Sequence, residues 1–281
     1  MVEQTNTVTV ESQRIEITGV QNARELGGYR TRDGTAVKRG LLLRTAQLGN
    51  AAPEELERLA ETYRVAHVID MRSSMEVAAS PEPELPSAER HWLQIMDEQQ
   101  MVRRAAPVRD VLTDPKTDQL TRLKACIEAG VVSDRMYAEC LDSEQGQSGY
   151  REFFRILLNN REGGAVLWHC TSGKDRTGIG AMLLLSALNV DEKTIIRDYM
   201  LTNDFFAGEL ADVRSRLKPV VKDEKLLEDM LVGTRGVSER YITNALTYMK
   251  EHYGSAVAYL QTKLGLTDVD LTTLRQLYTE A

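Results

Sequence analysis

The sequence predicts an α/β protein in which a central, largely parallel sheet is flanked by helices. Short runs rich in Val, Ile and Leu, suited to buried strands, alternate with segments of helical spacing in the first part of the chain. From Asp191 onward the sequence is helix-like throughout, which predicts a helix-rich C-terminal half. No internal repeat or linker is visible, so a single domain over residues 1–281 is expected, with 1–13 as a flexible N-terminus.

Five short runs are predicted to form strands. VAHVIDMR is β-branched in the manner of a buried strand, and AVLWHC is apolar up to a His-Cys pair. HWLQIMD is the weakest of the five and follows the Pro-rich turn SPEPELPS. In chain order the predicted strands are Arg14–Thr18, Leu41–Leu48, Val65–Arg72, His91–Asp97 and Ala165–Cys170.

Helices are predicted between and after these strands. One begins near Pro53 and carries apolar residues at helical spacing, and another opens with RTGIGAMLLLSALN. The polar helical segments 99–135 and 207–236 are candidates for lids or insertions over a site, with ordinary surface helices as the alternative.

Composition and charge limit the classes of function. Hydrophobic residues make up 42% of the 281 residues and charged residues 27%, which is typical of a soluble globular protein. The net charge of −7 gives no basic footprint for nucleic acid or an anionic membrane. No apolar run approaches the length of a membrane span, and MVEQTNTVTVESQR lacks the pattern of a signal peptide. We therefore expect a cytoplasmic location, with secretion by a route without a cleaved signal as the alternative.

Cysteine and histidine are few, and they lack the spacing of metal ligands. The sequence therefore predicts no metal site, no cofactor and no disulfide framework, in keeping with a reducing compartment. These residues are Cys126, Cys140 and Cys170 together with His67, His91, His169 and His252.

The segment AVLWHCTSGKDRTGIGAMLLLSAL places charged and small residues between a strand and an apolar helix. Cys170 ends the strand and precedes the helix N-terminus, where the helix dipole and loop amides favour a thiolate. The amides of Thr171, Ser172 and the residues up to Arg176, pointed inward, would form a nest for an anion. Gly173 supplies the backbone freedom that such a loop needs.

Arg176 follows Cys170 by six positions, so that its planar fork can return over the same anion with paired hydrogen bonds. Thr177 places a hydroxyl beside the sulfur, and Gly178 lets the first helical turn pack closely. Lys174 is expected to be a mobile positive charge at the rim, suited to a second phosphate. A nucleotide P-loop is excluded, because its leading glycine and its metal-binding hydroxyl are both absent from this loop.

The residues HCTSGKDRTG resemble the signature loop of the protein tyrosine phosphatase superfamily, and the GKDRTG form is most similar to the bacterial tyrosine/lipid phosphatases of dual or triple specificity. Further stretches are similar to the same branch. They are Asn22–Leu48, Val68–Val77, Ile195–Asn203 and Tyr253–Leu266.

The resemblance implies a tyrosine phosphatase-like fold with Cys170 as nucleophile and Arg176 as phosphate clamp. Asp175 is implied as the general acid, because the chain has no Trp-Pro-Asp tripeptide, and Asp97 is the alternative. His169 is expected to orient the loop. Asp70, Arg72 and Glu76 are expected to form a structural ion-pair network.

We therefore expect a cysteine-dependent phosphatase that hydrolyses phosphomonoesters through a phosphocysteine. The resemblance implies phosphotyrosine as substrate, with phosphoserine, phosphothreonine and phosphoinositides or inositol phosphates beside it. Two alternatives are a phosphate-binding module without catalysis and a rhodanese-like or arsenate-reducing thiol enzyme. The sequence does not indicate the oligomeric state.

Overall fold

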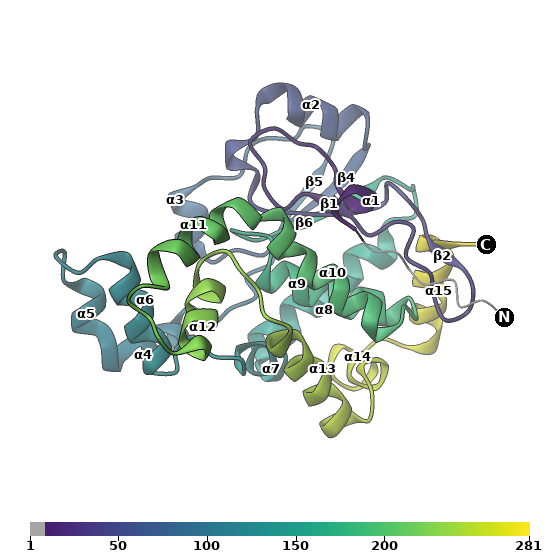
Figure 1. The fold of residues 1–281 in the computed structure, drawn as a ribbon. Helices are drawn as coiled ribbons and strands as arrows, with labels where there is room; N and C mark the ends of the chain where they lie inside the picture. The colour runs from purple at the N-terminus through teal and green to yellow at the C-terminus, as the bar shows by residue number, and fades with distance from the viewer. Residues whose placement is uncertain (1–8) are drawn as a thin grey trace.

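The computed structural model describes residues 9–281, and these residues form a twisted sheet packed between helices (Figure 1). The sheet has the strand order β1-β3-β6-β4-β5, and β3, β6, β4 and β5 run parallel, with β1 antiparallel at one edge. The predicted α/β fold with a largely parallel sheet is confirmed. The strands are β1 (Arg24–Glu25), β3 (Leu42–Thr45), β4 (Val65–Asp70), β5 (Glu89–Trp92) and β6 (Ala165–His169).

Helices cover both faces of this sheet, and their bounds follow the order of the chain. They are α1 (Val10–Gln13), α2 (Pro53–Glu61), α3 (Ser74–Ala79), α4 (Glu98–Ala105), α5 (Arg109–Thr113), α6 (Gln119–Glu128), α7 (Met136–Asp142), α8 (Glu144–Asn159), α9 (Asp175–Ala187), α10 (Glu192–Phe205), α11 (Ala207–Leu217), α12 (Glu224–Thr234), α13 (Glu239–Tyr253), α14 (Ala256–Leu264) and α15 (Asp268–Tyr278). A small separate ladder pairs β2 (Ala36–Val37) with β7 (Thr279–Glu280). None of the helices in residues 9–281 is long and apolar enough to cross a membrane.

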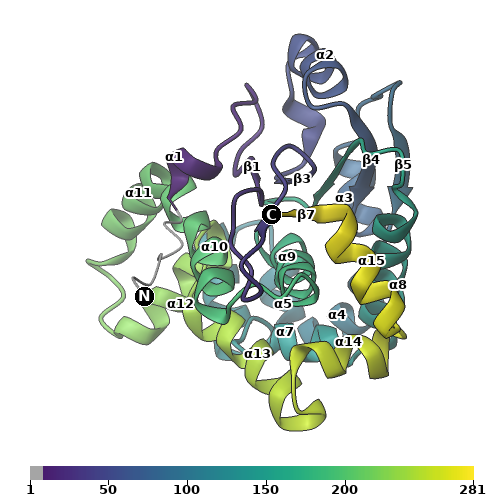
Figure 2. The ribbon, with the colours of Figure 1, turned by 90° about the vertical axis from the view of Figure 1, so that its right-hand side faces the viewer.

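The alternation of side chains along the strands divides the core into two layers. Val68 and Leu167 pack with Leu59 of α2 on one face of the sheet. Ile69 and Trp168 belong to the larger core on the other face, which α8, α9, α13 and α14 complete. Helix α9 is apolar almost all round and buried, as a helix at the centre of a core should be (Figure 2).

The run Leu41–Leu48 forms a strand only over Leu42–Thr45, and the strands predicted over 14–18 and 91–97 are wrong in extent. Segment 14–18 makes only an isolated bridge between Arg14 and Arg24, because its buried isoleucines pack into the core without a strand ladder beside them. The strand predicted over 91–97 is instead Glu89–Trp92, and the chain then turns to begin α4. Of the predicted flexible N-terminus, residues 1–8 lie outside the described residues, and the short helix α1 follows them.

The two segments considered as lids pack against each other. Leucines of α6 contact the buried residues of α12 in a small hydrophobic cluster separate from the main core. The approach is close, because a Cβ on Gly233 would lie 2.3 Å from the Leu123 side chain. Figure 1 shows α4–α6 together with α11 and α12 on one side of the molecule. The arrangement gives the protein a second, smaller helical layer beside the carboxyl end of the sheet.

Candidate active site

The loop between β6 and α9 lies at the carboxyl end of the central strand. Every residue of β6 is buried, and Cys170 after it is only 1% exposed. Gly173 has a φ of +65°, and a Cβ there would lie 2.3 Å from the Thr45 carbonyl oxygen. Only glycine fits this turn, so the sequence fixes a tight loop around the cysteine.

Two side chains hold the outer carbonyls of this loop. Asn22 Nδ2 donates to the Ser172 and Gly173 oxygens, each at 3.0 Å. Arg44 Nη2 donates to the same Gly173 oxygen at 2.9 Å. Because the C=O of one residue and the N–H of the next point in opposite directions across a planar peptide, these bonds turn the Gly173 and Lys174 amides toward the inside of the loop.

A buried carboxylate in turn holds those two anchors. Asp198 of α10 accepts from Arg24 Nε at 3.1 Å and from Arg44 Nη1 at 2.6 Å, and Arg24 also bonds Asn22. Burial alone would raise the pKa of Asp198, but the charges of Arg24 and Arg44 outweigh it and hold that pKa below its usual value. Burial, followed by the charge of Arg24, lowers the pKa of Arg44 to about 10.

One edge of the Arg176 guanidinium is already occupied by a carboxylate. Its Nη1 lies 2.6 Å from Glu76 Oε2 and its Nη2 lies 2.8 Å from Glu76 Oε1. Its Nε is buried and has no hydrogen-bond partner within residues 9–281. A guanidinium has two edges for bidentate bonding, so the Nε/Nη2 edge stays available to an oxyanion.

Glu76 is held in place from three sides. The Ser73 amide donates to its Oε2 at 2.9 Å in a capping box of α3, and the Thr171 hydroxyl donates to its Oε1. Burial favours the neutral acid, yet the hydrogen bonds and charge of Arg176 lower the pKa of Glu76 to about 2. The carboxylate is therefore ionised throughout the neutral range and fixes the orientation of Arg176.

This pairing corrects part of the predicted ion-pair network. Asp70 and Arg72 do pair, with Asp70 Oδ2 2.7 Å from Arg72 Nη2, and Glu82 completes that group at 2.9 Å from the same nitrogen. Glu76 instead bonds Arg176 in the candidate site. The sequence spacing suggested one cluster, but helix α3 turns Glu76 toward the loop.

Asp175, the first residue of α9, is the carboxylate that the loop itself contributes. Its Oδ1 accepts from the Tyr137 hydroxyl at 2.5 Å, and Tyr137 shares a second bond of 2.8 Å with Tyr199. Burial, and then the charge of Asp175, raise the pKa of Tyr137 well above its usual value. The phenol therefore stays protonated and can donate to Asp175.

Lys174 is not the mobile rim residue that the sequence suggested. Lys174 is only 7% exposed. Its Nζ donates to the Val232 carbonyl oxygen and to the Gly236 carbonyl oxygen, the latter at 3.2 Å. The Asp175 carboxylate lies 3.7 Å from the same nitrogen. The carbonyls at the end of a helix attract a cation, so α12 draws Lys174 away from solvent.

The remaining predicted loop residues are buried around Cys170. His169 Nδ1 lies 3.3 Å from the Cys170 carbonyl oxygen, a contact suited to orienting the loop. The Thr177 hydroxyl is buried and has no hydrogen-bond partner in residues 9–281. Gly178 packs closely as expected, since a Cβ there would lie 3.2 Å from the Tyr199 ring.

Asp97, the alternative acid, does not lie at the end of a strand. Strand β5 ends at Trp92, and Asp97 is the N-cap of α4, where its side chain accepts from the Gln99 and Gln100 amides at 2.8 and 3.1 Å. These bonds satisfy the first turn of the helix. The structure therefore gives Asp97 a capping role.

A cavity of about 820 Å³ lies between α6 and the α11–α12 pair. Three arginines line it, Arg122, Arg216 and Arg235. Arg235 Nη1 also donates to the Ser172 hydroxyl at 2.8 Å, which joins the cavity to the loop. Two acids, Asp118 and Glu209, line the same cavity, and Glu209 pairs with Arg235 at 3.4 Å, so Arg235 is the cation that links this mixed-charge cavity to the loop.

Sequence reasoning missed several residues that shape this site. Asn22, Arg44 and Asp198 lie in stretches that resemble blocks of the family. The signal that could have pointed to them is that these polar residues stand in segments expected to be buried. Tyr137 lies in α7 and Arg235 directly follows α12, and neither residue carried a sequence signal.

A family model and several known proteins are similar to this chain over most of its length. The sequence model of a family described as "Tyrosine phosphatase family" matches residues 15–280. A Cupriavidus necator protein whose name assigns it to the tyrosine-protein phosphatases is 30% identical, over 92% of this chain and 86% of its own. The triple specificity protein phosphatase PtpB of Mycobacterium tuberculosis is 26% identical, over 88% and 92%. A tyrosine-protein phosphatase of Nostoc commune is also 26% identical, over 86% and 75%.

Proposed function

The chain belongs to the tyrosine phosphatase family, and we propose that it hydrolyses phosphomonoesters through a phosphocysteine intermediate on Cys170. One observation carries the proposal. The Nε of Arg176 has no partner in the described part of the chain while Glu76 holds the Nη1/Nη2 edge, so the Nε/Nη2 edge can supply two donors to the phosphate of a substrate at Cys170. The inward amides of the loop supply the remaining donors.

In the first step the Cys170 thiolate attacks phosphorus in line with the ester oxygen. The S–P bond forms while the P–O bond breaks, and Asp175 donates a proton to the leaving oxygen. Arg176 and the loop amides bind the equatorial oxygens, whose charge they stabilise in the transition state. Tyr137 acts on this step through Asp175, which it positions.

In the second step water attacks the phosphocysteine. Asp175, now a carboxylate, takes a proton from the water, and the S–P bond breaks to return the thiolate and inorganic phosphate. The Thr177 hydroxyl, buried and unpartnered within residues 9–281, is available to bond the departing sulfur. His169 keeps the loop in register through the Cys170 carbonyl.

The substrate class extends beyond phosphotyrosine in this proposal, to phosphoserine, phosphothreonine and phosphoinositides or inositol phosphates. The arginine-lined cavity beside the loop supports it, because Arg235 offers a second cation within reach of a multiply phosphorylated ligand. The name of the Mycobacterium tuberculosis relative, which records triple specificity, supports the same breadth. The helices of 99–135 and 207–236 would cover such a ligand as a lid.

The test compares wild-type protein with Cys170→Ser, and with Cys126→Ser as a control at a second thiol, which lies in the wall of the cavity and outside the loop. We expect hydrolysis of p-nitrophenyl phosphate by wild type and the control, and none by Cys170→Ser. Rapid-quench mass spectrometry should detect phosphate on Cys170. Full turnover by Cys170→Ser would overturn the mechanism.

Two other outcomes would favour the alternatives. Phosphate binding without turnover in the wild type would indicate a binding module. A persulfide or an oxidised Cys170 in place of the phosphorylated form would indicate a different thiol chemistry. A panel of phosphotyrosine peptides, phosphoserine peptides, phosphoinositides and inositol phosphates then defines the substrate class.

A further inference from the structure

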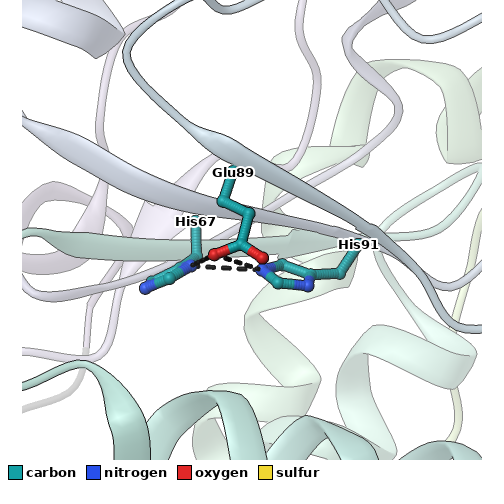
Figure 3. A group of neighbouring side chains, drawn as sticks. All are labelled: His67, Glu89 and His91. Carbon is teal, nitrogen blue, oxygen red and sulfur yellow. Dashed lines mark hydrogen bonds and ion pairs between the residues drawn. The ribbon is translucent and has the colours of Figure 1, made fainter.

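Strand pairing brings two histidines and a glutamate together far along the chain from the Cys170 loop. Strands β4 and β5 pair in parallel with His67 opposite Glu89 and Ile69 opposite His91. Alternate residues of a strand point to the same face, so Glu89 and His91 share a face with His67. Figure 3 shows the three side chains pointing toward one another.

The ligand atoms of this group converge on one point. His67 Nδ1 and His91 Nε2 face each other at 3.1 Å. Glu89 Oε2 lies 3.6 Å from the first nitrogen and 3.8 Å from the second. Ligands bound to tetrahedral zinc at about 2.0–2.1 Å stand about 3.3–3.4 Å from one another. The three atoms therefore outline one face of such a coordination sphere with little movement needed.

The surroundings favour an ion over a simple ion pair. The His67 and His91 side chains are only 17% and 12% exposed, while Glu89 is 68% exposed at the edge strand. No Lys or Arg of the described chain forms an ion pair with Glu89. The donors thus lie half-sheltered, and water can reach the fourth position from the Glu89 side.

We propose that His67, Glu89 and His91 bind a divalent transition-metal ion, with Zn²⁺ as the ion that suits two imidazole nitrogens and one carboxylate. The ion would hold edge strand β5 to β4, because its ligands come from both strands. One coordination position stays open to water.

A second group of acids and a histidine does not carry the same inference. Asp70, Glu82 and His169 also lie close together, but Arg72 pairs with both carboxylates at 2.7 and 2.9 Å. The guanidinium already supplies the positive charge there. It therefore competes directly with a cation.

The test measures Zn²⁺ binding by titration calorimetry on metal-free Cys170→Ser protein, which removes the loop thiol as a competing ligand. We expect one Zn²⁺ per chain. Because changes in the surroundings of a ligand alone weaken metal binding about 10–100-fold, loss of a ligand in His67→Ala or Glu89→Gln should weaken it at least tenfold. His252→Ala, at an exposed histidine elsewhere, should bind like the parent.

Spectroscopy and exchange make the result specific. Co²⁺ in place of Zn²⁺ should give the absorption of a tetrahedral site without a thiolate charge-transfer band. Hydrogen exchange of the β5 amides should slow on adding Zn²⁺, and Glu89→Gln should abolish that slowing. Glu89→Gln changes a side chain that is 68% exposed, so it tests the site without disturbing the core even if His67→Ala unfolds the protein.

Three results would overturn the site. The first is no Zn²⁺ binding to the parent protein. The second is unchanged binding in the double variant His67→Ala/His91→Ala. The third is a thiolate band with Co²⁺, which would place the ion at Cys126 or Cys140. In the first case the close nitrogens form only a hydrogen bond. None of these results bears on hydrolysis at Cys170, so the site and the proposed function fail separately.

Discussion

Glu76 holds Arg176 by the two terminal nitrogens of its guanidinium, and the Nε of Arg176 stays without a hydrogen-bond partner within residues 9–281. The two residues are 100 positions apart in sequence. Their pairing means that Arg176, the proposed phosphate clamp, is oriented before any anion arrives. Glu76 is therefore a positioning residue for the proposed reaction.

Glu76→Gln should lower kcat for p-nitrophenyl phosphate by about tenfold to a hundredfold, because a misdirected Arg176 binds the transition state poorly. KM should change less than kcat. Glu57→Gln, at an exposed position of α2, is the control and should behave like wild type. Equal activity of the two variants would show that Arg176 is oriented without Glu76.

The same pair predicts a pH dependence of stability. The pKa of Glu76 falls from 4.5 to about 2 on folding, so its contribution is complete above pH 4.5 and disappears as the pH falls toward 2. Wild type should exceed Glu76→Gln in free energy of unfolding by about 1–3 kcal/mol at pH 7. Urea denaturation at pH 7 and near pH 3 measures both values, and a constant gap would contradict the assignment.

Asp175→Asn and Asp97→Asn distinguish the two candidate acids. Asp175→Asn should slow phosphoserine hydrolysis by about a hundredfold to ten-thousandfold, since alkoxide leaving groups need a proton. The decrease in the rate of p-nitrophenyl phosphate hydrolysis should be smaller, because nitrophenolate can leave without being protonated. Asp97→Asn should retain activity in both assays and keep its cap. Reversed effects would make Asp97 the acid.

Arg235 and Lys174 should have different effects when replaced. Arg235→Ala should reduce hydrolysis of an inositol bisphosphate about tenfold more than that of p-nitrophenyl phosphate, as expected for one lost charged contact worth about 1.4 kcal/mol. Lys174→Met should mainly lower the melting temperature, because Lys174 satisfies the carbonyls of Val232 and Gly236. Selective loss of bisphosphate hydrolysis in Lys174→Met would instead support the role predicted from the sequence, in which Lys174 binds a second phosphate.

Asp198→Asn should destabilise the protein by about 3–5 kcal/mol, because it leaves the buried charges of Arg24 and Arg44 unpaired. Asp204→Asn, an exposed change on the same helix, is the matched control. Chemical denaturation compares them. A loss below about 1 kcal/mol, the worth of a surface pair, would refute the anchoring role.

The fold could be predicted because the buried strands and the largely apolar helix α9 appear in the sequence as distinct apolar runs. The loop could be predicted because its residues are contiguous, from Cys170 to Arg176. Glu76, Lys174 and the His67 group could not be assigned this way, since their partners are set by tertiary packing. The periodicity of apolar residues predicts which side of a helix or strand a residue lies on. The strand register and the positions of the helix ends determine which residue it contacts there.

The carbonyl anchors of Asn22 and Arg44 also affect what happens after the chemistry. In the proposed reaction, the free phosphate product would meet the same loop donors as the ester phosphate, because the bonds from Asn22 and Arg44 hold the loop in both cases. Inorganic phosphate therefore competes for the same amides and the same Arg176 edge. The proposed mechanism therefore implies product inhibition by phosphate. A variant with a higher turnover rate would need a loop that releases phosphate more readily.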